Sequence, residues 1–214
     1  PPLHGRPALL PSASPWFFLG ATPPRAAGAG AGGLVVVADP ANPSAPRLTA
    51  PTVPGARTLT GAAATPSQVL AALATARYAE LHVHGVADAA AAEGAFLLLA
   101  PEPDGRDRLT AAEVAGARLT GAPVIVLAAC RAAETTPFLQ ARWSLPDAFL
   151  AAGARAVIAA DVELPDRAAS ALFAELRRRI DGGEAPAAAL AAVRQVPAWA
   201  SWAGHLMLFD AGAP

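Results

Sequence analysis

The chain has 214 residues, of which 54% are hydrophobic and 15% charged, and its formal net charge is -1. This composition can bury a full core and excludes a disordered segment, while scattered charges without a basic stripe argue against nucleic acid as the main partner. The length suits one α/β domain, or one domain with a small appendage.

The basic residues and the single cysteine indicate the type of genome and the cellular compartment. All 16 basic residues are Arg, and Ala, Gly and Pro are over-used with them, which indicates a GC-rich bacterial genome. The single cysteine excludes an internal disulfide framework and a Cys-rich zinc site, and it fits a reducing cytoplasm. No stretch reaches the roughly 18–20 apolar residues that span a bilayer, so we expect a cytoplasmic protein without a membrane partner.

Residues 1–33 are rich in Pro, Gly and Ala, and we interpret them as an N-terminal extension. The chain begins at Pro1 without an initiator Met, so we expect it to be part of a longer protein. The glycine run 28–33 precedes a strand and opens no helix. A phosphate-binding glycine loop has the opposite order, so we interpret this run as a flexible loop.

Residues 34–214 are predicted to form one domain in which strands alternate with helices. Predicted strands are 34–37, 80–84, 96–99, 124–127, 156–159 and 205–209, and predicted helices are 67–76, 110–117, 145–152, 166–180 and 186–195. Thr65-Pro66 and Thr110 with Glu113 are helix-start signals, and Gly153 is a helix-end signal. The order predicts an α/β fold, a mostly parallel sheet with helices on both faces.

Two predicted strands lead into reactive side chains. One runs into His84-Gly85, and the other, wholly apolar, leads to Cys130, 46 positions further on from residue 84. Functional residues gather beyond the carboxyl ends of parallel strands, and neighbouring strands can hold two side chains across a site. A cysteine nucleophile needs a nearby imidazole to take its proton, and the oxyanion needs backbone N–H donors, for which Gly85 and Cys130 are the candidates.

The same segments resemble a known family. The strand-end His84-Gly85, the apolar strand before Ala129-Cys130, the segment 145–159, and the upstream pattern Leu59-Thr60-Gly61 are similar to the CHAT domain, a relative of caspases, metacaspases, gingipains and separase. The resemblance runs from Leu34 to the C-terminal stretch.

This resemblance implies a caspase-like sheet, a catalytic dyad of His84 and Cys130, and an oxyanion hole formed by Gly85 and Cys130. No cofactor is implied. A protein or peptide substrate and a regulatory or sensor module are the implied partners. The family commonly continues Ala-Cys-Glu-Thr-Gly, whereas this chain reads Arg131-Ala132-Ala133 after Cys130, a departure that we expect to affect substrate preference.

Other interpretations of these residues stand beside the catalytic one. A lone cysteine at an Ala-rich strand end is, without its context, a small buried hydrophobe. His82 and His84 lie two apart and would share one face of a strand, as a metal pair does, but no motif supplies further ligands. We therefore expect no metal site, and we expect His82 to be a packed or hydrogen-bonded neighbour.

Three acids, Asp161, Glu163 and Asp166, follow the predicted strand 156–159. They have two interpretations of equal weight. They form a solvated helix N-terminus with Asp166 placed against the helix dipole, or they line an S1 pocket that receives a basic P1 side chain.

The sequence therefore predicts a cysteine endopeptidase that cleaves a partner protein, with a P1 preference for basic residues if the acids line S1. The main alternative is a catalytically inactive caspase-like module retained for binding. A flavodoxin-type small-molecule domain is the second alternative, and it lacks a phosphate-binding motif.

Overall fold

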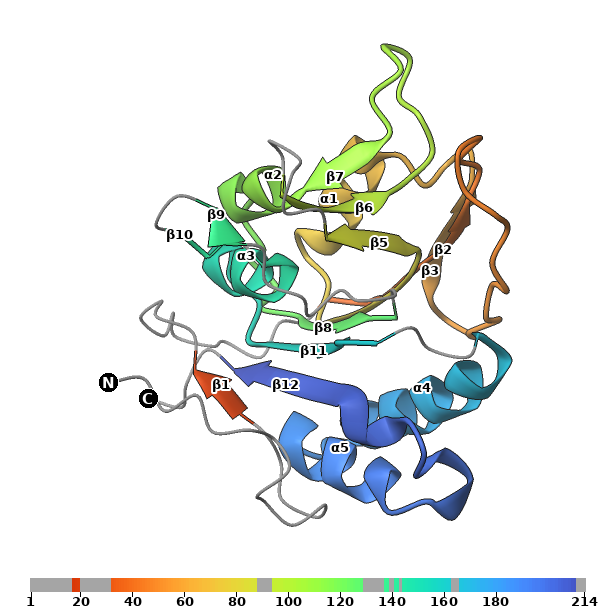
Figure 1. Ribbon diagram of the computed structural model, residues 1–214, viewed down its shortest axis with the longest axis vertical. Helices are drawn as coiled ribbons and strands as arrows, with labels where there is room; N and C mark the ends of the chain where they lie inside the picture. The colour runs from red at the N-terminus through yellow and green to blue at the C-terminus, as the bar shows by residue number, and fades with distance from the viewer. Residues whose placement is uncertain are drawn as a thin grey trace.

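The computed structural model describes residues 17–19, 32–87, 94–128, 137–138, 141–142, 144–162 and 166–210. Its main sheet contains strands β1 (Phe17–Leu19), β2 (Leu34–Pro40), β3 (Arg57–Gly61), β4 (Tyr78–His82), β8 (Val124–Leu127), β11 (Ala156–Ala160) and β12 (Leu206–Asp210). Their order across the sheet is β1-β12-β11-β8-β4-β2-β3 (Figure 1).

Parallel pairing dominates this sheet. β3, β2, β4, β8 and β11 are parallel neighbours, β12 pairs antiparallel with β11, and β1 is parallel to β12. The carboxyl ends of the parallel strands therefore lie at one edge of the sheet, which we call the carboxyl edge. The fold is the predicted mixed α/β arrangement, with a mostly parallel sheet.

Helices cover both faces of this sheet (Figure 1). They are α1 (Pro66–Leu73), α2 (Ala111–Gly116), α3 (Leu145–Ala152), α4 (Asp166–Asp181) and α5 (Pro186–Arg194). Side chains of α1, α2 and α3 pack in one buried cluster with Leu81 and Leu127 of the sheet. Side chains of α4 and α5 pack in another cluster with Tyr78 and Val126. Alternate residues of β4 and β8 thus face different helical layers, as the period of two requires.

A small antiparallel sheet lies on the α1–α3 side (Figure 1). It consists of β5 (His84–Ala87), β6 (Ala95–Leu98) and β7 (Arg108–Thr110), in that order. A further short pair joins β9 (Pro137–Phe138) and β10 (Ala141–Arg142). Leu97 and Leu109 of the small sheet belong to the buried cluster of α1–α3, so this sheet is part of the same core.

Local sequence signals account for several of the helix ends. Thr110 accepts the N–H of Glu113 at 3.2 Å, and the Glu113 carboxylate accepts the N–H of Thr110 at 2.9 Å, which completes the predicted capping box. Gly153 ends α3 with φ 112°, in the left-handed region that favours glycine. Pro66 starts α1 as predicted, although the Thr65 side chain makes no capping hydrogen bond.

The structure differs from the sequence predictions in several places. β3 and β7 were not predicted, because each buries a single leucine, Leu59 or Leu109, and neither shows a clear apolar alternation. The predicted strand 80–84 is wrong at its end. β4 ends at His82, the chain turns at Val83, and His84 begins β5 in the other sheet. The two histidines therefore do not share one strand face.

A fully buried carboxylate lies in the middle of β4. Arg177 of α4 donates from Nη1 to both oxygens of Glu80 at 2.7 Å, and the Tyr78 hydroxyl donates to Oε1 at 2.9 Å. His82 Nε2 lies 3.0 Å from Oε2. Burial and the neighbouring Glu80 charge raise the pKa of Tyr78, so its phenol stays protonated and donates. The network joins the α4 layer to the strand that leads to His84.

Removing Arg177 is expected to leave an uncompensated buried charge. We predict that Arg177→Ala lowers the free energy of unfolding by about 3–5 kcal/mol, measured by urea denaturation at neutral pH. Arg178 is the matched control, because it is the next residue on α4 and pairs with Glu175, but its side chain is 67% exposed against 15% for Arg177. Equal effects of Arg177→Ala and Arg178→Ala would contradict the structural role of the buried pair.

Candidate functional site

The strands leading to the two predicted catalytic residues are hydrogen-bonded neighbours. β4 and β8 pair in parallel from Tyr78 opposite Val124 to Leu81 opposite Leu127. The two strands therefore end side by side at the carboxyl edge. His82 is the last residue of β4, and Cys130 comes three residues after the end of β8 in the sequence. Cys130 itself lies outside the described residues.

His84 occupies a defined position just beyond β4. It is the first residue of β5, opposite Leu98 of β6, and it is partly exposed. Its Nε2 lies 2.8 Å from the carbonyl oxygen of Pro46, in the segment that follows β2. A carbonyl oxygen can only accept, so Nε2 carries the proton, and in the neutral ring Nδ1 is the acceptor atom. A ring held in this tautomer can act as a general base through Nδ1.

Gly85 follows in β5 opposite Leu97. It lies next to the imidazole, at the position that the sequence assigns to an oxyanion donor. The second assigned donor, the N–H of Cys130, lies outside the described residues. The role of both groups in an oxyanion hole stays a prediction.

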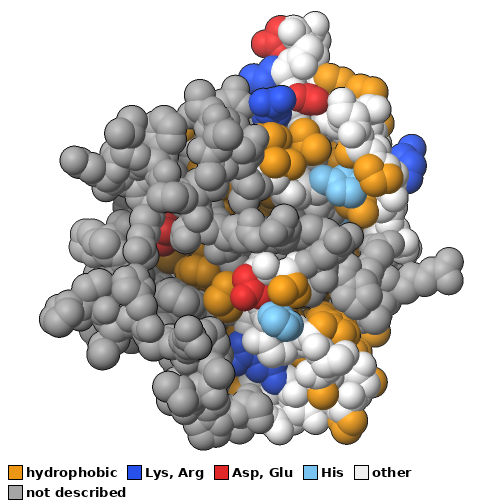
Figure 2. Space-filling view, in the orientation of Figure 1, with side chains coloured by type: hydrophobic (Ala, Val, Ile, Leu, Met, Phe, Trp, Pro, Cys, Tyr) orange, Lys and Arg blue, Asp and Glu red, His pale blue; other side chains and the backbone are white. Residues whose placement is uncertain are grey.

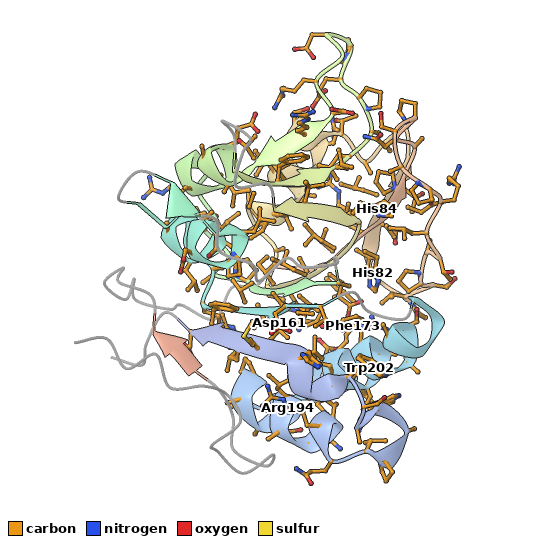
Figure 3. The ribbon with its side chains drawn as sticks, viewed as in Figure 1. His82, His84, Asp161, Phe173, Arg194 and Trp202 are labelled. Atoms are coloured by element: carbon orange, nitrogen blue, oxygen red, sulfur yellow. The ribbon has the colours of Figure 1, made fainter. Side chains whose placement is uncertain are left out.

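His82 faces the α4 layer, close to Phe173, and lies apart from His84, which belongs to the small sheet (Figure 3). It is buried, bonded to Glu80 and packed edge-to-face on Phe173 of α4, with ring centroids 5.7 Å apart. The expectation that His82 is a packed, hydrogen-bonded residue is therefore confirmed. Within the described residues, no group of three or more His, Cys, Asp or Glu side chains is placed to hold a metal ion.

Of the three predicted S1 acids, Asp161 is the one whose side chain is described. It directly follows β11, at the same carboxyl edge, and its Oδ1 lies 3.1 Å from His205 Nδ1. The N–H of Asp161 also donates to the His205 carbonyl oxygen, at 3.4 Å. Glu163 lies outside the described residues, and Asp166 begins α4 with its side chain undescribed.

Sequence reasoning missed the Asp161–His205 pair. The two residues are 44 positions apart, and they meet because β11 and β12 pair antiparallel, with Ala160 opposite Leu206. No local motif signals this contact. Figure 2 shows two separate histidine side chains on one face of the molecule, one of them beside an acidic side chain, with hydrophobic surface around both.

Comparisons with known proteins agree with this architecture. A sequence profile of the CHAT domain matches residues 21–199. The structure of separase from Saccharomyces cerevisiae, solved in complex with securin, superposes with a TM-score of 0.58 at 12% identity over 94% of this chain. The Arg-specific cysteine proteinase gingipain R superposes with a TM-score of 0.51 at 13% identity over 83% of this chain.

The alignments cover 12% of the separase chain and 45% of the gingipain chain, so this chain spans a minor part of both. At such identities the likeness shows the fold alone, which is that of the caspase-like cysteine peptidases. A comparison with curated proteins found no significant match. Within the described residues, no helix has the length and apolar character required to cross a membrane.

The Asp161–His205 pair is expected to contribute little to stability. Both side chains are about half exposed, at 44% and 49%, so solvent screens their interaction. We predict that Asp161→Asn and His205→Ala each change the free energy of unfolding by less than about 1 kcal/mol, measured by urea denaturation. A loss comparable with that of Arg177→Ala would instead make the pair a structural element.

Proposed function

Because the chain belongs to the CHAT domain family and has a caspase-like fold, we propose that it is a cysteine endopeptidase with His84 and Cys130 as its catalytic dyad. The observation that carries the proposal is the hydrogen bond from His84 Nε2 to the Pro46 carbonyl. It leaves Nδ1 as a base at the edge where the neighbouring strand β8 leads to the only cysteine of the chain.

The chemistry follows from these two groups. Nδ1 of His84 takes the thiol proton, and the Cys130 sulfur attacks the carbonyl carbon of the scissile peptide bond. The imidazolium then protonates the leaving amine as the C–N bond breaks, which leaves a thioester on Cys130. Water attacks the thioester, and His84 takes a proton from that water and returns it to the sulfur. Gly85 and the Cys130 N–H are the proposed donors to the oxyanion in both steps.

Peptide-library cleavage tests the dyad. We expect the wild-type protein to cleave, and we expect Cys130→Ala and His84→Ala each to lower kcat/KM by at least about a thousandfold, because the nucleophile and its base act as one unit. Glu175→Gln is the control, as it removes a carboxylate on α4 that pairs with Arg178, and it should retain cleavage. Cleavage by Cys130→Ala at the wild-type rate, or none by the wild-type protein, would favour the inactive interaction module instead.

A preference for a basic P1 residue is the finer part of the proposal. Asp161 presents a partly exposed carboxylate at the carboxyl edge, and its bond to His205 uses Oδ1, so Oδ2 can accept from an arginine side chain. Gingipain R, which has the same fold, is an Arg-specific proteinase. A charge-assisted bond of this kind selects strongly for a cationic side chain.

The library also reads out this preference. We expect wild-type cleavage after Arg or Lys, and we expect Asp161→Asn to lower kcat/KM for an Arg-P1 peptide by roughly 10- to 100-fold, from a lost charge-assisted bond of about 1.5–3 kcal/mol. Glu163→Gln and Asp166→Asn test the other two acids in parallel. Loss of the preference in one of these variants alone would assign the S1 carboxylate to that residue, and an unchanged preference in all three would remove the acids from S1.

We also propose that the substrate is a partner protein and that a regulatory or sensor module gates cleavage, as the relatives of this family imply.

A further inference from the structure

The carbonyl that contacts His84 belongs to an irregular segment after β2, residues 42–48, which we call the Pro46 strap. Proline at positions 43 and 46 restricts its backbone, because the pyrrolidine ring sets φ. The strap is not part of a helix or strand, so its position depends on side-chain contacts. Two such contacts hold it, one at each end.

Asn42 anchors the first end. The residue is 6% exposed, and Nδ2 donates to the Leu99 carbonyl at 2.6 Å and to Asp107 Oδ2 at 3.0 Å. Its Oδ1 accepts the N–H of Ser44 at 2.8 Å. Leu99 follows β6 and Asp107 precedes β7, and β6 lies between β7 and β5, the strand of His84. Asn42 thus ties the strap to the sheet that positions the imidazole.

Asp39 anchors the second end. It lies in β2 with φ 45°, a left-handed conformation that is uncommon for a residue with a side chain. Its Oδ1 accepts from Arg47 Nε at 2.8 Å and from the N–H of Leu48 at 2.9 Å, and Oδ2 accepts from Arg47 Nη2. These bonds hold the two residues that follow Pro46.

The charge of Asp39 also reaches His84. The hydrogen bond from Arg47 lowers the pKa of Asp39 most, and the positive charge of a protonated His84 lowers it further. Asp39 therefore acts on His84 through the strap, which its carboxylate holds.

We propose that Asn42 and Asp39 are positioning residues that hold the Pro46 carbonyl against His84 Nε2 and so keep Nδ1 as the base. The inference rests on the proposed function, because it assigns a task to the same dyad. We expect Asn42 to contribute more than Asp39 to the position of the strap. The hydrogen bond from Asn42 to Leu99 is buried, whereas Asp39 pairs with Arg47 at the surface.

Two readouts test the strap. The first is the downfield NMR signal of the His84 Nε2 proton, assigned by its disappearance in His84→Ala, since a proton bonded to a carbonyl exchanges slowly with water. The second is the rate at which iodoacetamide alkylates Cys130 at pH 7, which reports on one site because the chain has one cysteine. The rate follows the thiolate fraction, which the imidazole raises.

We expect the Nε2 proton signal to be lost in Asn42→Ala and weakened in Asp39→Asn. We expect alkylation to slow by about 5- to 30-fold in Asn42→Ala and by about 2- to 5-fold in Asp39→Asn, from the usual size of buried and surface polar contacts. Glu175→Gln is the matched control, because it removes a carboxylate that also pairs with an arginine but lies on α4. It should leave both readouts at the wild-type level.

The outcomes separate the two proposals. If folded Asn42→Ala and Asp39→Asn keep the proton signal and the wild-type alkylation rate, the strap has a structural role only and the inference is overturned. If Asn42→Ala does not fold, Asp39→Asn carries the test. If His84→Ala alkylates as fast as the wild-type protein, the dyad fails, while the proton signal still reports whether Asn42 and Asp39 hold the ring.

Discussion

The parallel register of β2, β4, β8 and β11 is the constraint on which the rest of this structure depends. Backbone hydrogen bonds align these strands, so their carboxyl ends meet at one edge, where the chain continues to His84, Cys130 and Asp161. Because side chains alternate along a strand, a slip of β4 by one residue would turn the Glu80 carboxylate away from Arg177. The buried Glu80–Arg177 pair therefore destabilises the wrong register and so stabilises the alignment of the strand ends at the carboxyl edge.

The fold places residues of the same type in different environments. His82 and His84 are two positions apart, yet a turn at Val83 places one under α4, bonded to Glu80, and the other in the small sheet, bonded to Pro46. The acids divide in the same way. Glu80 is fully buried and bonds to three side chains, whereas Asp161 is partly exposed and, among the described residues, bonds to the side chain of His205. Asp161, the exposed acid at the carboxyl edge, is therefore the one that we propose as a contact for a basic P1 side chain.

Polar contacts from distant segments converge on His84. Asn42 reaches the ends of β6 and β7, and Asp39 holds the residues after Pro46, so the imidazole is oriented by a loop that belongs to no regular element. The position of such a loop depends on a few side-chain contacts. We therefore propose that Asn42 and Asp39 set the position of the Pro46 strap. The buried Glu80 network supports β4 from the opposite face.

The sequence by itself determined the alternation of strands and helices, the capping box at Thr110, the helix end at Gly153 and the strands that lead to the two reactive residues, because these follow from local periodicity and backbone preference. Only the tertiary structure decided where β4 ends, that β3 and β7 form, and that Asp161 meets His205 and His84 meets Pro46. Those contacts join residues about 40 positions apart, and no local pattern encodes them. They form because sheet pairing brings the segments together, which is a property of the packed chain as a whole.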